Sequence, residues 1–189
     1  MRYRRLKIPG ATYFFTVVTH DRRPLFRDPS AVALFKAGVN RIQSRHPFTV
    51  DATVILPDHI HTLWTLPDGD ANFSTRWRLI KEAFTKAYIR DHPLPEPSAS
   101  RRAKGEQPIW QRRFWEHVIR DDADYAAHAD YIHYNPVRHG LVSAARDWPH
   151  SSFADWVARG ALGEGWGTAA MPKLLAWMER YEMDRVGAV

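Results

Sequence analysis

The chain has 189 residues, carries 27 Lys and Arg against 21 Asp and Glu, and contains no cysteine. The absence of cysteine excludes disulfides, thiolate metal sites and cysteine nucleophiles. No stretch approaches the roughly 20 apolar residues that cross a bilayer, and the first residues contain no apolar signal core. We therefore expect a folded intracellular protein, and the surplus of positive charge over residues 1–146 suggests a polyanionic partner.

Hydrophobic periodicity predicts four strands and four helices. Runs of β-branched and aromatic residues indicate strands, and apolar residues spaced three and four apart indicate helices. In chain order the predicted elements are a strand at 13–19, a helix at 30–45, strands at 48–56 and 60–66, a helix from 74 through 88, a strand at 114–120, a helix from 121 or 122 to 135, and a last amphipathic helix that begins near 172. Ser30 is the expected cap of the first helix, and Pro136 is expected to end the third.

The order of these elements indicates an α+β fold. Hairpins and helical crossovers are mixed, which favours an antiparallel sheet with helices packed on it, of the ferredoxin-like or RRM-like type. The Pro-rich stretch 91–108 is predicted to be a mobile loop. Residues 1–155 are expected to form one domain, and 156–189 an acidic amphipathic C-terminal tail that packs on it or covers its basic surface.

Two histidines supply the first candidate site. On a strand, His59 and His61 project from one face while Ile60 points to the other, toward the core. Two imidazoles on one face can share a metal ion, and an amide oxygen, water and a phosphate as further ligands would suit Mg²⁺ or Mn²⁺. Because the chain has 10 histidines, a pair of ordinary surface or hydrogen-bonding histidines is an open alternative.

A tyrosine and an asparagine share one face of the third predicted helix. Tyr131 and Asn135 are four residues apart and therefore stack on the same side, with His128 one turn earlier. If this face meets the histidines, a metal gains an amide ligand and the phenol lies beside a phosphate that the metal polarises. Attack by the phenol would give a covalent tyrosyl phosphate. Helix packing with a cap before Pro136 is the alternative.

Basic residues occur in clusters near these segments. Arginine and lysine bind phosphates, and neighbouring aromatic rings can stack on unpaired bases. The residues predicted to contact DNA are Arg2, Arg4, Arg5, Lys7, Arg76, Arg78, Lys81, Arg112, Arg113 and Arg138. For each cluster a solvated basic surface without a partner is the alternative.

Several blocks of sequence occur together in the order typical of one known family. They are Arg4-Arg5, Tyr13 to Val17, Leu56 to His61, Phe73 to Trp77, Ile109 to His117 and Tyr131 to Val142. Over about residues 2–155 the chain resembles the REP-associated tyrosine transposases, bacterial relatives of the single-tyrosine HUH transposases.

The resemblance implies a fold, a chemistry and a substrate. The fold would be a ferredoxin-like core with the two histidines on a central strand. His59 and His61, with Asn135 as third ligand, would hold Mg²⁺ or Mn²⁺, and Tyr131 would be the nucleophile. The substrate would be single-stranded DNA folded into hairpins by repetitive extragenic palindromes (REPs), which is cut to leave a 5′-phosphotyrosine and then rejoined.

Some alternatives stay open at this point. Tyr125 and Tyr134 are rivals of Tyr131 for the role of nucleophile. A hairpin-binding protein without catalysis and a metal-dependent phosphodiesterase that uses water are rivals of the tyrosine enzyme. A monomer in the bacterial cytoplasm, associated with the nucleoid, is expected, since processing one hairpin requires no second copy.

Overall fold

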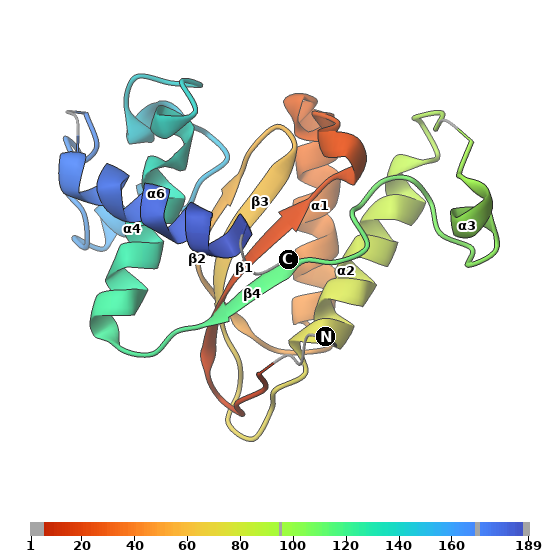
Figure 1. Cartoon of the computed structure of the whole chain (residues 1–189), viewed down its shortest axis with the longest axis horizontal. Helices are drawn as coiled ribbons and strands as arrows, with labels where there is room; N and C mark the ends of the chain where they lie inside the picture. The colour runs from red at the N-terminus through yellow and green to blue at the C-terminus, as the bar shows by residue number, and fades with distance from the viewer. Residues whose placement is uncertain (1–5, 95, 169–170, 187–189) are drawn as a thin grey trace. The chain divides into compact units, whose positions relative to one another are not determined.

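The computed structural model describes residues 6–94, 96–168 and 171–186, and the chain falls into two compact units (Figure 1). The first unit comprises Met1–Asp51 and Ile55–Ile119, and the second comprises Ala52–Val54 and Arg120–Val189. No helix in the described ranges is long and apolar enough to cross a membrane.

An antiparallel sheet forms the basis of the first unit. Its strands are β1 (Thr12–Val18), β2 (Thr49–Ile55), β3 (His59–Thr65) and β4 (Trp115–Val118), in the spatial order β2-β3-β1-β4. β1 is antiparallel to both of its neighbours, β3 and β4. With a helix between β1 and β2 and another between β3 and β4, this order is the ferredoxin-like arrangement. The predicted α+β fold is therefore confirmed.

Two long helices cover one face of this sheet (Figure 1). They are α1 (Pro29–Gln43) and α2 (Phe73–Tyr88), which pack on each other, and two short turns, η1 (His20–Arg22) and η2 (Leu25–Arg27), precede α1. The cap of α1 is Asp28, whose carboxylate accepts the N–H of Ser30 at 2.8 Å, so the predicted Ser30 cap is wrong by two residues. Pro29 at the first helical position fits this start, because proline needs no N–H partner there.

Aromatic side chains fill the space between the helices and the sheet. Trp77 of α2 stacks on Trp64 of β3 with ring centroids 4.2 Å apart, and Phe15 of β1 contacts both rings edge-on. Ile60 belongs to the same core, as predicted, so the histidines on either side of it face away from α1 and α2. Trp77, although flanked by arginines in sequence, is a core residue and not a base-stacking surface.

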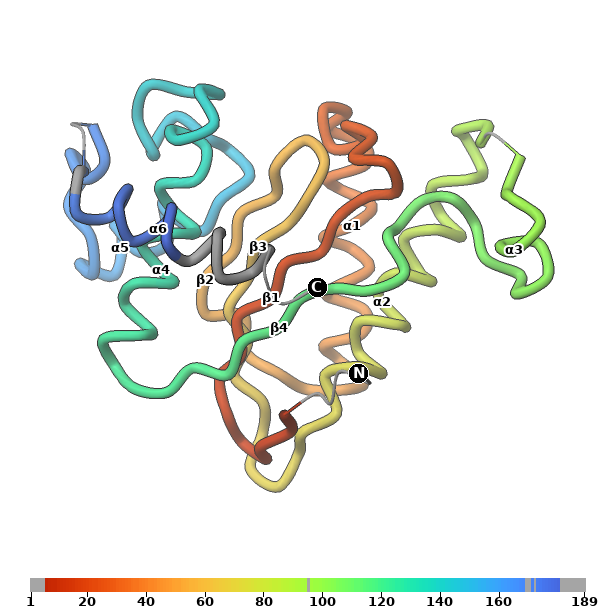
Figure 2. Tube along the Cα trace, in the orientation of Figure 1, coloured from red at the N-terminus to blue at the C-terminus, as the bar shows by residue number. Residues whose placement is uncertain are grey.

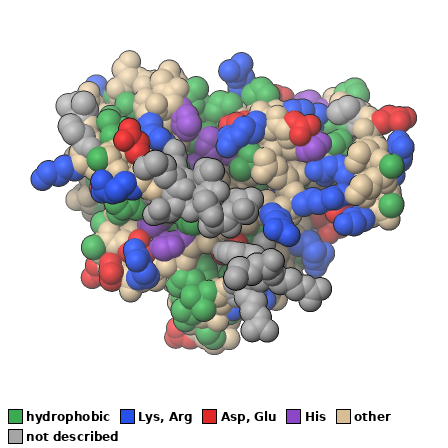
Figure 3. Space-filling model, in the orientation of Figure 1, with side chains coloured by type: hydrophobic (Ala, Val, Ile, Leu, Met, Phe, Trp, Pro, Cys, Tyr) green, Lys and Arg blue, Asp and Glu red, His purple; other side chains and the backbone are tan. Residues whose placement is uncertain are grey.

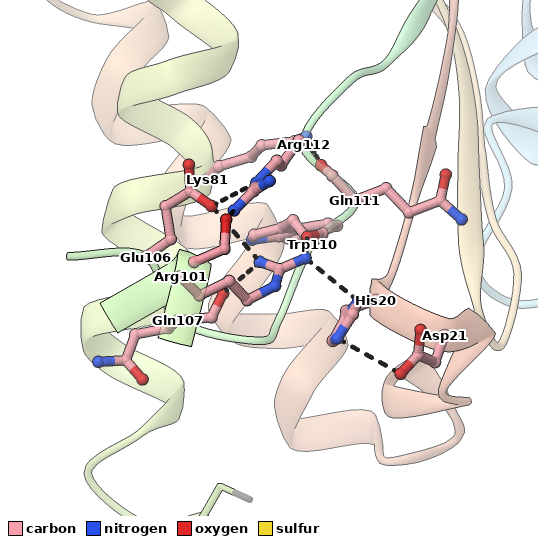
Figure 4. Close-up of polar contacts among 10 residues, drawn as sticks. His20, Asp21, Lys81, Arg101, Glu106, Gln107, Trp110, Gln111 and Arg112 are labelled. Carbon is pink, nitrogen blue, oxygen red and sulfur yellow. Dashed lines mark hydrogen bonds and ion pairs between the residues drawn. The ribbon is translucent and has the colours of Figure 1, made fainter. Parts of the chain in front are cut away.

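The long connection from α2 to β4 contains a short helix and a buried arginine. It leaves α2, contains the short helix α3 (Ala99–Arg102) and returns along β4 (Figure 2). Arg101 anchors it: the buried guanidinium donates to the carbonyls of Gln107 and Trp110 and lies 3.2 Å from His20 Nδ1 (Figure 4). A buried arginine with several acceptors fixes the connection, which proline content alone did not indicate.

Helices dominate the second unit. They are α4 (Asp122–Arg138), η3 (Ala145–Asp147), α5 (Phe153–Ala158) and α6 (Pro172–Val186). α6 packs on α4 and buries Leu174 and Met178. The predicted domain boundary after residue 155 falls inside α5, so the division into 1–155 and 156–189 stays a prediction.

The predicted end of α4 at Pro136 is wrong. The helix continues to Arg138 with the proline inside its last turn. Beyond it, Gly140 with φ +65° donates to Val137 O and Leu141 donates to Pro136 O, which is the Schellman pattern. These two bonds satisfy carbonyls at the helix end, and the single N–H that proline lacks does not stop the helix.

Ser152 joins the strand segment of the second unit to α4. Its Oγ accepts the Thr53 N–H at 2.9 Å and lies 3.0 Å from His133 Nε2. Burial, with a smaller contribution from Arg159, lowers the pKa of His133 to about 4. The imidazole is therefore neutral at pH 7, the form that a buried site without a carboxylate favours.

Arg76 is buried in the first unit, although the sequence placed it among the DNA contacts. Its guanidinium is 3% exposed, pairs with both oxygens of Asp70 and donates to the carbonyls of His46, Pro47 and Asn72. This fork ties the start of α2 to the segment that precedes β2. Hydrogen bonding from Arg76 to the Asp70 carboxylate holds the pKa of that carboxyl below its ordinary value.

We expect Arg76→Met to lower the free energy of unfolding by about 2–4 kcal/mol, because it leaves a carboxylate and buried carbonyls without their donor. The exposed neighbour Arg78 is the control, and Arg78→Met should change stability by no more than about 0.5 kcal/mol. Folding lowers the pKa of Asp70, so its ion pair with Arg76 stabilises the fold at pH values above the ordinary pKa of 3.8 and ceases to do so when acid protonates the carboxylate. The loss of stability caused by Arg76→Met should therefore become smaller in acid. Urea unfolding at several pH values measures this, and equal effects of the two variants would contradict it.

Candidate metal and tyrosine site

The two candidate histidines lie side by side on the sheet face that α1 and α2 do not cover. His59 pairs across the ladder with Val18, and His61 pairs with Thr16. The two rings have centroids 4.8 Å apart and an interplanar angle of 81°. Both side chains are buried, with exposed fractions of 7% for His59 and 2% for His61. They are therefore not surface histidines, whereas the alternative of a hydrogen-bonding pair without a metal is not contradicted.

Each imidazole is held through its Nδ1 atom. His61 Nδ1 lies 2.9 Å from Thr16 Oγ1, and His59 Nδ1 donates to Asp58 Oδ1 at 2.5 Å. With Nδ1 engaged, Nε2 is the ring atom through which each histidine would coordinate a metal. Histidine ligands commonly have this second hydrogen bond, which fixes the tautomer and the ring orientation. The pair therefore fits a divalent cation.

The carboxylate behind His59 is ionised. Burial opposes its ionisation, but the hydrogen bonds and charges of His59 and Arg22 outweigh burial and lower the pKa of Asp58 to about 2. Arg22 donates to Asp58 Oδ2 at 3.0 Å.

Tyr131 and Asn135 occupy one face of α4 in the second unit. Asn135 is fully buried and its Nδ2 reaches the Tyr131 carbonyl at 3.4 Å. Its Oδ1 has no hydrogen-bond partner among the residues that the structure describes. A buried amide oxygen without a donor is costly, and it is the atom that an oxygen-preferring cation would take.

The other two tyrosines of α4 have different surroundings. The Tyr125 ring stacks near Trp156, and Tyr134 is packed against Trp166 and Gly167. The Tyr131 ring contacts Trp177 of α6 edge-on, with centroids 6.1 Å apart. Tyr131 is thus the tyrosine that shares a face with Asn135. The histidine pair lies in the first unit and the Tyr131–Asn135 pair in the second.

The predicted DNA contacts differ in their accessibility. Lys7, Arg78, Arg112 and Arg113 are exposed, Arg138 of the second unit is half-buried, and Arg2, Arg4 and Arg5 lie outside the described residues. Lys81 is half-buried over the rings of Trp110 and Phe114 and donates to the Gln111 carbonyl. Arg112 pairs with Glu106 and donates to Ser100. Because Arg76 is buried, we leave it out of the DNA surface.

Lys and Arg side chains gather over the region of α2 and α3 in Figure 3. Sequence reasoning did not include two exposed members of the α3 segment, Arg102 and Lys104. The sequence did contain a signal for them, because both are basic residues close to Arg101, just after the Ser-Ala-Ser stretch. They were left out because this segment was predicted to be a mobile loop. Thr16 and Arg22 were also missed, and neither has a local sequence signal.

Comparison with known proteins gives close relatives over most of the chain. It is 42% identical over 164 residues to a REP-associated tyrosine transposase of Escherichia coli K12, and the aligned residues cover 87% of this chain and 89% of that protein. It is also 42% identical over 165 residues to a Haemophilus influenzae protein with the same family name, covering 87% and 92%. No protein-family model matches the chain.

A solved structure extends this likeness to three dimensions. The structure of a REP-associated tyrosine transposase bound to a REP hairpin matches with a TM-score of 0.73 and 39% identity, over 90% of this chain and 94% of that one. The similarity therefore covers both units of the chain.

The buried oxygen of Asn135 has a consequence for stability. In metal-free protein, Asn135→Leu removes an acceptor without a donor and nearly keeps the side-chain shape, so the free energy of unfolding should stay unchanged or rise by about 1 kcal/mol. Ser152→Ala, in the same unit, removes a partnered group and should lower it by about 1–2 kcal/mol. Thermal and urea unfolding in chelator measure both, and a clear loss of stability in the Asn135 variant would refute this reading.

Proposed function

Because the chain belongs to the REP-associated tyrosine transposases, a family of enzymes that act on DNA, we propose that it cuts and rejoins single-stranded DNA at REP-type hairpins through a 5′-phosphotyrosine intermediate. The observation that carries the proposal is the pair His59 and His61, buried side by side with each Nδ1 hydrogen-bonded. The orphaned amide oxygen on the face of Tyr131 supports it independently.

His59, His61 and Asn135 would hold one divalent cation, Mg²⁺ or Mn²⁺. Two imidazole nitrogens and one amide oxygen are ligands that such an ion would accept together with water and a phosphate oxygen. When bound, such an ion polarises the phosphate and stabilises the charge that develops on it. The protein holds both rings by their Nδ1 atoms, so their ligand atoms are oriented before the ion arrives.

Tyr131 would be the nucleophile. Its phenol gives up its proton as Oη bonds to phosphorus, and the bond between phosphorus and the 3′ oxygen breaks. The released 3′ oxygen takes up a proton, and the 5′ phosphate stays esterified to the tyrosine. Rejoining runs in the opposite sense: a 3′ hydroxyl attacks the phosphotyrosine and the phenol leaves with a proton. The phosphodiester energy is conserved in the intermediate, so no further energy source is required.

The basic residues predicted to contact DNA, apart from the buried Arg76, would bind the phosphates of the hairpin. In the first unit these are Lys7, Arg78, Lys81, Arg112 and Arg113, with the terminal residues Arg2, Arg4 and Arg5 in addition. Arg138 would add a contact from the second unit. The Lys and Arg side chains that gather over α2 and α3 support a path for the sugar-phosphate backbone on this part of the first unit (Figure 3).

We further propose that the protein acts as a monomer and that residues 1–155 carry the chemistry. One copy supplies the histidines, the amide and the phenol. The predicted bacterial location beside the nucleoid follows from the proposed substrate.

The central prediction concerns a covalent adduct. Labelled single-stranded DNA with a REP hairpin and flanking bases should give a protein–DNA band on a denaturing gel in Mn²⁺ and none in chelator. Tyr131→Phe should abolish the band, because it removes the attacking oxygen, and should keep hairpin binding within about twofold. Tyr125→Phe and Tyr134→Phe are the matched controls and should keep the band.

Two results would argue against this mechanism. Cleavage without an adduct in the wild type would make water the nucleophile. An adduct that survives Tyr131→Phe and disappears in Tyr134→Phe or Tyr125→Phe would move the role to another residue of α4.

The DNA track gives a second prediction. Arg78→Gln and Arg113→Gln should each weaken hairpin binding several-fold and lower the slope of log K against log salt by about 0.7–0.9, one phosphate contact each. Lys36→Gln removes the same charge from an exposed position on α1 and should leave the slope unchanged. Fluorescence anisotropy at several salt concentrations measures the slopes. Equal slopes for all three variants would show that Arg78 of α2 and Arg113, just before β4, do not contact DNA phosphates.

A further inference from the structure

Asp58, the residue before the histidine pair, is held at three points within the first unit. Its Oδ1 accepts the N–H of His59 Nδ1, and its Oδ2 accepts from Arg22 at 3.0 Å. Its backbone carbonyl accepts the N–H of Thr19 at 2.9 Å. The carboxylate is thus fixed in position and in rotation, with one oxygen for the histidine and one for the arginine.

This geometry decides which nitrogen of His59 can bind a metal. A carboxylate can only accept a hydrogen bond, so the proton of the neutral ring lies on Nδ1 and Nε2 has the lone pair. Nδ1 and Nε2 lie on different edges of the imidazole, so Asp58 sits behind the ligand and is not a ligand through the same oxygen.

The turn that carries Arg22 is built at a conformational cost. Asp21 and Arg22 have φ angles of 52° and 49°, in the left-handed region that residues with a side chain avoid. Such backbone persists where neighbouring bonds determine it. Here Thr19 provides them, because its Oγ1 donates to the Arg23 carbonyl at 2.8 Å and its carbonyl accepts the Arg22 N–H at 3.2 Å.

Arg22 also resolves an electrostatic conflict. A carboxylate beside a site for DNA phosphate would repel the substrate, whereas the ion pair with Arg22 makes the added charge close to zero. The Nδ1 atom of His61 meets the hydroxyl of Thr16, a neutral group. The two rings of the pair are therefore supported unequally.

We propose that Asp58 is a positioning residue for the metal site, which sets the tautomer and orientation of His59 and is itself held by Arg22 and the turn from Thr19 to Arg23. The proposal rests on the metal site of the proposed function. It assigns a role outside the ligand set to Asp58 and to the residues that hold it.

The test is Mn²⁺ affinity, measured by the electron paramagnetic resonance signal of free Mn²⁺ in titrations of the full chain. Asp58→Asn and Asp58→Ala should weaken binding about 10–100-fold, the range typical of lost partners behind a metal ligand. Asp68→Asn, which removes the same charge from an exposed turn at the other end of β3, should change affinity less than about twofold.

A second readout separates positioning from direct ligation. In metal-free protein labelled with ¹⁵N-histidine, His59 should have its proton on Nδ1, and Asp58→Ala should move proton population to Nε2. If Asp58 were a ligand, its loss would lower affinity without changing the tautomer of His59.

The outcomes are distinct for the two proposals. Unchanged affinity and unchanged tautomer in both Asp58 variants would overturn the positioning role. If instead the wild type, His59→Ala and His61→Ala all failed to bind Mn²⁺, the metal site of the proposed function would be overturned and the role of Asp58 with it. Should Asp58→Ala fail to fold, Asp58→Asn retains the side-chain shape and carries the test.

Discussion

The register of β1 against β3 is the constraint on which the candidate chemistry depends. Antiparallel pairing of Thr16 with His61 places both histidines on the same face as the Thr16 hydroxyl, and puts Ile60 among the aromatic residues beneath α1 and α2. A shift by one residue would exchange the two faces, because strand side chains alternate with a period of two. It would bury two imidazoles against Trp64 and Trp77 and expose the core. The packing of the aromatic core therefore fixes where the ligand atoms lie.

The candidate site consists of two prearranged pairs, each built from local geometry. The histidines are neighbours by strand alternation and are held by Thr16 and Asp58. Tyr131 and Asn135 are neighbours by helical spacing on α4. Within each pair the side chains are already ordered by folding, so substrate binding does not lose the conformational entropy of ordering them. The buried amide oxygen of Asn135 has the opposite character, since it has a cost on folding that a bound cation would offset.

Local periodicity was sufficient for the parts of the fold and site that depend on neighbours in sequence. It predicted the strands, the face of the histidines and the shared face of Tyr131 and Asn135, because these follow from periods of two and about 3.6. It could not supply Thr16, which meets His61 across a pairing 45 residues apart, or Arg22, whose left-handed backbone has no signature in a residue with a side chain. Arg76 was misjudged because its charge suggested solvent exposure, while two of its acceptors, the carbonyls of His46 and Pro47, lie 30 and 29 residues earlier in the chain.

The second unit is discontinuous in the chain, and this has an evolutionary consequence. Ser152 Oγ accepts a hydrogen bond from the backbone N–H of Thr53. Thr53 belongs to the short segment Ala52–Val54, which is part of the second unit although it lies about 100 residues earlier in the chain. A gene fragment that begins at Arg120 would encode α4 without the strand that Ser152 needs. Ser152 Oγ would then lose the Thr53 N–H that donates to it. An exchange of α4 between relatives therefore has to preserve the backbone of β2 at Thr53 as well as α4 itself.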